Sequence, residues 1–345
     1  MKNAMRAGAW PAWILLLAAV SFMAHTSKAH HSAAMYDEKQ TLTIEGAVTK
    51  FEWSNPHVYI YMKQLTAAGP AVDWELEASP PSILRRLGWT QDTLHAGDTI
   101  TVTGHPARDA ARKSLIPILI KKGDAILFDR KGELARLESA GAAPAVSANP
   151  DLSGVWVTLL ALKVEEQMDP DKLSLTAKGK KALKHFDEKK NLPGANCVPY
   201  PAPVFMVTPD LKRITKGNGV ILIDGEFDGA RRVIHMNVAT HEGASDSVQG
   251  HSIGRWEDKS LVIDTTHFAA DAMGNAYGLP SGPGKRLAER LTPDGKGALT
   301  YHFELSDPEF LAAPVSGDVQ WVYRPNLTYA PLKCDLENAR RYARH

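Results

Sequence analysis

From Thr41 onward the chain reads TLTIEGAVTKFEW (41–53), HVYIYMKQL (57–65), VDWELEAS (72–79), DTITVTGHPA (98–107) and IPILIKKGDAILF (116–128). Such runs, rich in β-branched and aromatic residues and separated by turn residues, are typical of short β-strands. Between the third and fourth runs, SPPSILRRLGW (79–89) carries apolar residues at helical spacing behind two prolines. Five strands with a helix after the third are the order of an OB-type barrel, so the sequence predicts an OB-like five-stranded barrel.

A second series of strands follows in the C-terminal half. In ALTYHFELS (298–306), Tyr301, Phe303 and Leu305 fall on one face, and His302 and Glu304 fall on the other. The other runs are GVILID (219–224), RRVIHMNV (231–238), HSIGRWED (251–258), SLVIDTTHF (260–268) and DVQWVYRP (318–325). Antiparallel strands without intervening helices favour a closed up-and-down barrel, because closure removes exposed edges. The predicted fold class is mainly β, with a larger antiparallel barrel after the OB-like one.

Segments without strand patterns mark the domain boundaries. Residues 131–150 (KGELARLESAGAAPAVSANP) turn into Ala, Gly, Ser and Pro, which is typical of an exposed linker. At the start, Lys2 and Arg6 precede the apolar run WPAWILLLAAVSFMA, and Ser27 and Ala29 suit a signal-peptidase site. We therefore predict a signal peptide over 1–29, an OB-like domain over 30–130, a linker over 131–150 and a second barrel domain over 151–345. The apolar run is shorter than the ~20 residues that span a bilayer, so no stable membrane span is expected after cleavage.

Charge and cysteine content narrow the class of protein. The chain has 40 basic and 39 acidic residues, so no cationic field points to a nucleic-acid partner. Its two cysteines, Cys197 and Cys334, are expected to form a disulfide in an oxidising compartment, which predicts a periplasmic or secreted protein. Such a bond would hold the C-terminal segment against the proline-rich loop around Cys197. The absence of a GxxxxGK[ST] loop and of HExxH disfavours common nucleotide and zinc-protease chemistry.

Several motifs resemble known exported proteins. HHSAAMYD (30–37), GAVTKFEWSNPHVYIY (46–61), LRRLGWT (84–90) and AGDTITVTGHPARD (96–109) resemble an uncharacterised family of exported bacterial OB-like domains. DLSGVW (151–156), GHSIGRWED (250–258), SLVIDTTHF (260–268) and ERLTPDG (289–295) resemble the domain that often follows it. The G-x-W opening of that domain is similar to lipocalin-like barrels. The resemblance implies a calycin-like barrel over 151–345 and no particular activity.

The predicted mature N-terminus suggests a metal site. Cleavage after Ala29 would make His30 the first residue, so its α-amine, its imidazole and the imidazole of His31 would offer three nitrogens. Nitrogen-rich ligation suits Cu(II), and the arrangement resembles the copper histidine brace of exported oxygenases and copper carriers. Asp37, His57 and His105 are candidates to complete the ligand set. The alternative is that the two histidines form a solvated tail and that His57 caps the Asn-Pro turn.

A second group of ionisable residues lies in the larger predicted barrel. In HSIGRWED, His251 and Arg255 share parity with Ile253, so both would enter the barrel if Ile253 does. Buried ionisable groups need partners, which leaves a structural salt-bridge network and an acid–base site as the two interpretations. The candidate catalytic residues are His251, Asp264, Glu289, Arg232 and Arg255, and His235, His241, His267 and Arg290 are further polar residues in the same strands and loops.

Three functions are compatible with these features. The first is a periplasmic binding protein that holds a small, partly apolar organic ligand in its larger barrel and has a copper site at its N-terminus. The second is a cofactor-free acid–base enzyme, such as an isomerase, hydratase or hydrolase, that acts on such a ligand. The third is a copper-dependent oxidase that uses His30. The sequence does not identify the ligand.

Overall fold

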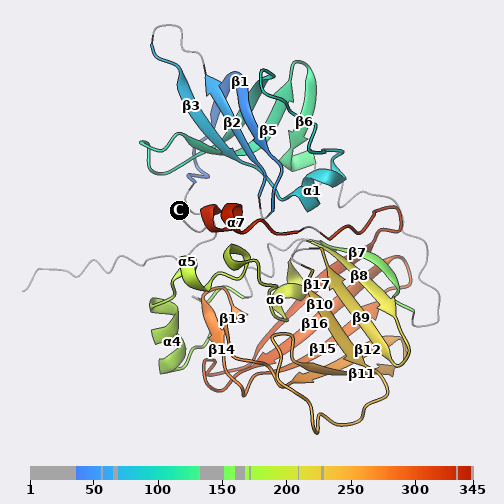
Figure 1. Cartoon of the computed structure of the whole chain (residues 1–345). Helices are drawn as coiled ribbons and strands as arrows, with labels where there is room; N and C mark the ends of the chain where they lie inside the picture. Colours follow the sequence, from blue (N-terminus) through green and yellow to red (C-terminus); the bar gives the residue numbers. More distant parts are fainter. Residues whose placement is uncertain are drawn as a thin grey trace, which may run out of the picture. The chain divides into compact units, whose positions relative to one another are not determined.

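The computed structural model describes residues 36–55, 57–64, 69–132, 151–159, 168–170, 172–208, 210–226, 229–331 and 333–342. The predicted signal peptide and most of the predicted linker lie outside these ranges. Within them the chain is mainly β and forms two closed barrels, one from the blue to green strands and one from the later strands in Figure 1. The prediction of a mainly β protein with a smaller and a larger barrel is therefore confirmed.

The first barrel has the strand order predicted from the sequence. β1 (Leu42–Glu52) pairs antiparallel with both β2 (Tyr59–Gln64) and β4 (Thr99–Pro106). β2 pairs with β3 (Val72–Glu77), and β5 (Ser114–Lys122) closes the barrel by pairing antiparallel with β4 and parallel with β3. The helix α1 (Pro81–Arg86) lies between β3 and β4 in the chain, as expected for an OB-like fold. Its Leu84 is fully buried in the core.

Two local features of this barrel depend on glycine. At Gly46 of β1, a Cβ atom would lie 2.4 Å from the carbonyl oxygen of Lys63. Only glycine allows the two backbones to approach so closely. The last predicted run, 116–128, is not one strand, because Gly123 with φ of 59° turns the chain back. The segment after this turn, β6 (Ala125–Asp129), pairs antiparallel with β5.

In the part of the chain that the structure describes, the second barrel is a closed ring of nine strands. In ring order the strands are β7 (Gly154–Leu159), β8 (Leu211–Lys216), β9 (Val220–Gly225), β10 (Arg231–His235), β11 (His251–Glu257), β12 (Ser260–Thr266), β15 (Arg286–Pro293), β16 (Ala298–Ser306) and β17 (Val315–Tyr323). β17 pairs with β7 and so closes the ring. Eight of the nine pairings are antiparallel, but β10 and β11 are parallel. The segment that joins β10 to β11 therefore runs back to the end of the barrel at which β10 begins. The predicted up-and-down barrel contained no such connection.

Smaller elements surround this ring. The segment around residue 180 contains α4 (Ala177–Lys184), capped by Thr176, and is followed by α5 (Glu188–Asn191). The short helices η2 (Gly194–Asn196) and α6 (Val204–Val207) lie in the proline-rich loop. A two-stranded ribbon, β13 (Asp271–Ala276) with β14 (Leu279–Ser281), is inserted between β12 and β15.

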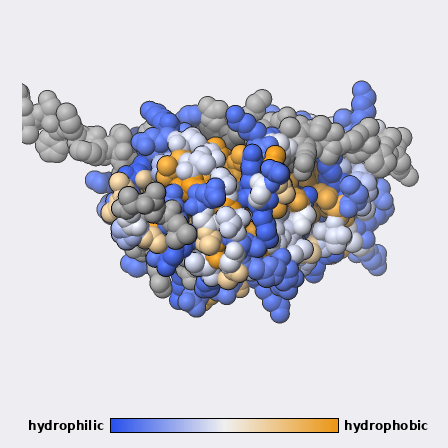
Figure 2. All heavy atoms as spheres, turned by 90° about the horizontal axis from the view of Figure 1, so that it is seen from above, coloured by the Kyte–Doolittle hydropathy of each residue, from blue (hydrophilic) through white to orange (hydrophobic). Residues whose placement is uncertain are grey.

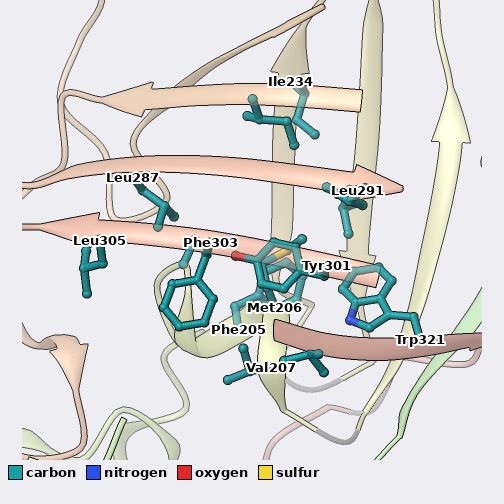
Figure 3. Packing of buried hydrophobic residues seen from close by; sticks show 14 of the residues in the cluster. Phe205, Met206, Val207, Ile234, Leu287, Leu291, Tyr301, Phe303, Leu305 and Trp321 are labelled. Carbon is teal, nitrogen blue, oxygen red and sulfur yellow. The ribbon is translucent and has the colours of Figure 1, made fainter. Parts of the chain in front are cut away.

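Side chains fill the interior of the second barrel. Trp156, Tyr301, Phe303 and Trp321 are all fully buried, and the aromatic rings of Tyr301 and Trp321 lie 6.0 Å apart. Helix α6 adds apolar side chains to the same core, and Figure 3 shows Phe205, Met206 and Val207 beside the inward residues of β16 and β17. The inward positions of β16 are the ones that its alternating sequence predicted.

The disulfide between Cys197 and Cys334 is present, with a Cα–Cα distance of 5.6 Å. Cys197 follows η2, and Cys334 precedes the C-terminal helix α7 (Leu336–Tyr342), which packs on η2. Ala339 of this helix is fully buried. The predicted attachment of the C-terminal segment to the proline-rich loop is therefore observed.

Hydrophilic residues cover most of the face seen in Figure 2, and hydrophobic residues gather near its middle. In the described residues, large exposed apolar side chains are few, and Ile126 at 59% is the most exposed of them. No helix in the described ranges is both long enough and apolar enough to cross a bilayer.

Lys285, just before β15, is an unusual buried cation. Its side chain is 1% exposed, its ammonium donates to the carbonyl oxygens of Ala202 and Gly274, and it lies 4.2 Å from the ring centroid of Phe268. Burial lowers the pKa of Lys285 to about 7 from its ordinary value of 10.5. Desolvation disfavours the charged amine, so the folded protein holds this proton less tightly than the unfolded chain does.

This difference predicts a pH dependence of stability. Between pH 7 and 10.5 the unfolded chain binds more protons at Lys285, so the free energy of unfolding should rise with pH, by at most about 1.4 kcal/mol per pH unit. Burial also lowers the pKa of Lys212 to about 8, which adds to the slope. Urea unfolding at pH 7, 8 and 9 should give a smaller slope for Lys285→Met than for the parent. Lys296→Met, at an exposed turn, should keep the parent slope. Equal slopes for the parent and Lys285→Met would contradict the assignment.

Candidate functional site

A pocket of about 360 Å³ lies at one end of the larger barrel. The residues that line it come from the start of β7, the β8–β9 turn, and the ends of β10 and β11. The strand pairings place these segments at the same end, since Gly154 lies opposite Ile214 and Val220 lies opposite His235. We call this pocket the mouth pocket. Its apolar lining consists of Leu152, Ile214, Val220, Ile221, Met236 and Trp256.

Polar groups line the rest of the mouth pocket. They include Asp151, Ser153, Lys216, Asn237 and Arg255. Hydrogen bonds, first from the Ser153 side chain and then from its backbone N–H, lower the pKa of Asp151. The Arg255 guanidinium is paired with Glu257 at 2.6 Å. The pocket therefore combines an apolar lining with one carboxylate and two cations.

A buried ion pair lies inside the barrel. Arg232 of β10 donates from Nη1 to Oε1 of Glu289 on β15 at 2.6 Å, and both side chains are 0% exposed. Arg232 Nη2 also donates to Thr265 Oγ1 at 2.7 Å, and Tyr301 donates its hydroxyl to Glu289 at 2.7 Å. Burial disfavours the charged form of Arg232, but the neighbouring Glu289 carboxylate keeps the pKa of the Arg232 guanidinium above its ordinary value. Burial, followed by the charge of Glu289, raises the pKa of Tyr301 well above 10. A fully enclosed and satisfied network of this kind favours the structural interpretation.

Four histidines form a cluster on the outer wall of the same barrel. They are His235 at the end of β10, His241 in the β10–β11 connection, His251 at the start of β11 and His267 after β12; we call them the histidine cluster. The ring centroids of His235 and His251 are 4.8 Å apart and those of His241 and His251 are 5.1 Å apart. Burial, and then the three neighbouring histidines, lower the pKa of His251.

Specific polar contacts orient three members of the histidine cluster. The Nδ1 atoms of His241 and His251 are 2.8 Å apart, and His241 Nε2 lies 3.0 Å from Asp264 Oδ2. His267 Nδ1 is 2.9 Å from Thr266 Oγ1. A second pocket, of about 420 Å³, adjoins the cluster and is lined in part by His241, His267 and Asp246.

The barrel wall separates the five predicted catalytic residues. On β11 it is Ser252 and Gly254 that are buried, whereas Ile253 is only half-buried and Arg255 is exposed. The condition that Ile253 faces the interior is not met, and His251 and Asp264 lie outside with the histidine cluster. Arg232 and Glu289 lie inside, and Arg255 lines the mouth pocket. The five residues therefore do not form one site.

Residues 250–254 read GHSIG, which has the letters of the GxSxG nucleophile pattern. That pattern marks a nucleophile only at a sharp turn between a strand and a helix, where the serine is exposed. Ser252 instead lies within β11, is fully buried and receives hydrogen bonds from Arg232. The local structure does not support a nucleophilic role for this serine.

The predicted copper ligands lie in or before the first barrel. His30 and His31 fall outside the described residues. The chain does return to the barrel at Tyr36, which forms a β-bridge with Ala107 and donates its hydroxyl to Glu77. His57 Nδ1 lies 3.1 Å from the carboxylate of Glu77, whose side chain is 2% exposed. The carboxylate that the sequence suggested beside His57 is Asp37, not Glu77.

Asp37 and His105 have other contacts. Asp37 accepts a hydrogen bond from Gln40 Nε2 at 2.7 Å, and His105 Nδ1 lies 2.7 Å from the Gln40 carbonyl oxygen. In the part of the chain that the structure describes, no three His, Cys, Asp or Glu side chains are arranged to hold a metal ion. The sequence pattern suggested Asp37, His57 and His105 as ligands because of their residue types, but their partners depend on tertiary packing.

Comparison with known proteins gives little information about the function. A family of unknown function (DUF6152) matches residues 17–116, which include most of the first barrel. This match supports the resemblance of the N-terminal domain to an uncharacterised family over these residues. No curated protein matches the chain.

Proposed function

We propose that the protein binds a small, partly apolar organic ligand in the mouth pocket. The observation that carries this proposal is the combination of an apolar lining with charged side chains in a pocket of about 360 Å³. Concave sites of roughly 300–1,000 Å³ with a few polar groups are typical of small-molecule binding. The mouths of β-barrels are among the usual positions of ligand sites, which is an argument from the fold alone.

The packing of the barrel limits the size of the ligand. Below the mouth pocket the interior is filled by buried rings and by the Arg232–Glu289 pair. The ligand would therefore lie at the mouth rather than deep in the barrel. Lys216 and Arg255 favour a ligand with a polar or anionic group, and Trp256 and Met236 favour an aromatic or aliphatic body.

Filling the mouth pocket should weaken ligand binding. Met236→Trp places a larger ring in the pocket, and we expect it to weaken binding of anilinonaphthalene sulfonate, an aromatic anion, by about tenfold or more. Val233→Trp, on the 37% exposed Val233 of β10, is the matched control and should bind as the parent does. Probe fluorescence in a titration, with the thermal midpoint measured in parallel, provides the test. Equal affinities for the two tryptophan variants would exclude the mouth pocket as the site.

The disulfide supports a periplasmic or secreted location, because such bonds persist in oxidising compartments. The acid–base alternative is less favoured, since His251 and Asp264 lie across the barrel wall from Arg232 and Glu289. The copper site and the copper-dependent oxidase remain predictions, because they rest on His30 and His31. Turnover of a bound ligand without metal would favour the acid–base alternative over simple binding.

A further inference from the structure

We propose that the histidine cluster binds one divalent transition-metal ion, of the class that prefers imidazole ligands and includes Zn²⁺. This site would be separate from the mouth pocket, with which it shares no lining residue, and from the predicted N-terminal copper site. Imidazole nitrogen suits Zn²⁺, Cu²⁺ and Ni²⁺, whereas Mg²⁺ and Ca²⁺ prefer oxygen ligands.

The first argument is the distance between two ring nitrogens. The Nδ1 atoms of His241 and His251 are 2.8 Å apart, and the two rings are nearly perpendicular at 80°. Two Zn–N bonds of about 2.0 Å at a tetrahedral angle hold their nitrogens about 3.3 Å apart. A metal ion could therefore take the place of the shared hydrogen if the two rings separate by about 0.5 Å and this hydrogen moves to Nε2 of His251 or to solvent.

The second argument is the carboxylate on the far side of His241. Asp264 Oδ2 lies 3.0 Å from His241 Nε2, which places the hydrogen of a neutral ring on Nε2 and leaves the lone pair of Nδ1 facing His251. Metal-ligating histidines commonly donate their other N–H to a carboxylate in this way. Asp264 would thus be a positioning residue that does not touch the metal.

The third argument concerns the remaining ligands. The rings of His241 and His267 are 6.0 Å apart, and those of His251 and His267 are 6.4 Å apart. His267 Nδ1 is engaged by Thr266, so Nε2 is the nitrogen of this ring that is available to a metal. No three such side chains of the described residues surround one position in the present rotamers, so binding requires rotation of His267. Water would complete the coordination.

Zinc titration of histidine variants tests the proposal. The full-length protein would carry His30→Ala and His31→Ala, to remove the predicted terminal site, and would have no histidine tag. After chelator treatment, equilibrium dialysis should find one equivalent of Zn²⁺, and zinc should raise the thermal midpoint. His241→Gln and His251→Gln should each weaken binding by about tenfold or more, and Asp264→Asn should do so by about 10–100-fold with partial rescue by Asp264→Glu.

The matched control is His302→Gln. His302 lies on the outer face of β16 and is paired with Asp318 at 3.0 Å, so it is also a surface histidine beside a carboxylate. Its variant should bind zinc as the parent does. Metal-free thermal midpoints of all variants show whether the barrel is intact. Absence of zinc binding by the parent, or equal binding by the parent, His241→Gln and His251→Gln, would overturn the proposal.

Discussion

Replacing Glu289 by Gln is expected to lower the free energy of unfolding by about 3–5 kcal/mol, because it leaves the charge of Arg232 buried without its partner. Arg232 lies on β10 and Glu289 lies on β15, with β11 and β12 between them in the sheet. The Arg232 guanidinium therefore reaches Glu289 over the inner face of β11 and β12, where it also donates to Ser252 and Thr265. No solvent reaches either side chain to compensate the lost charge.

Urea unfolding followed by circular dichroism measures this effect. Glu304→Gln, at an exposed position of the neighbouring strand β16, is the control and should change the free energy of unfolding by less than about 0.5 kcal/mol. The double variant Arg232→Met/Glu289→Leu should recover most of the loss, because apolar side chains of similar size need no partner. A loss below about 1 kcal/mol for Glu289→Gln would argue against a charged Arg232 in the interior.

Removing the disulfide is expected to have the second large effect. Cys197 and Cys334 are 137 residues apart in sequence, and for such a loop the chain-entropy relation gives an upper value of about 5 kcal/mol. We therefore expect Cys197→Ser/Cys334→Ser to destabilise the protein by about 2–5 kcal/mol. The same change should release α7 from η2, because the bond joins these two elements.

Thermal midpoints and limited proteolysis check the two parts of this prediction. Tyr329 donates its hydroxyl to the Gly225 carbonyl oxygen at 2.9 Å and lies under Arg213, so the chain should remain anchored up to that residue. New cleavage is expected only after Tyr329, and probe binding at the mouth pocket should survive at low temperature. Two outcomes would contradict this prediction. One is the detection of two free thiols in protein produced in an oxidising compartment, and the other is an unchanged thermal midpoint in the variant.

Three strands of the larger barrel, β7, β8 and β15, were not among the runs predicted as strands. The inward positions of β8 and β15 include Lys212 and Glu289, so neither of these two strands has a continuous apolar face. Lys212 is stabilised by the Thr208 and Asp210 carbonyl oxygens, and Glu289 by Arg232 and Tyr301. The partners of Glu289 come from other strands, and those of Lys212 lie just before β8. Alternation of hydrophobicity within one strand carries no information about either set.

The sequence by itself determined the strand order of the first barrel, the shared faces of β16 and the pairing of the two cysteines. These features depend on local alternation, on turn residues and on there being only two thiols. The histidine cluster and the mouth pocket were decided by the tertiary structure. A period of two assigns His251, Ile253 and Arg255 to one face of β11, but only barrel closure decides that this face points outward. The parallel return to β11 then places His241 beside His251, since long-range contacts follow from closure and not from local pattern.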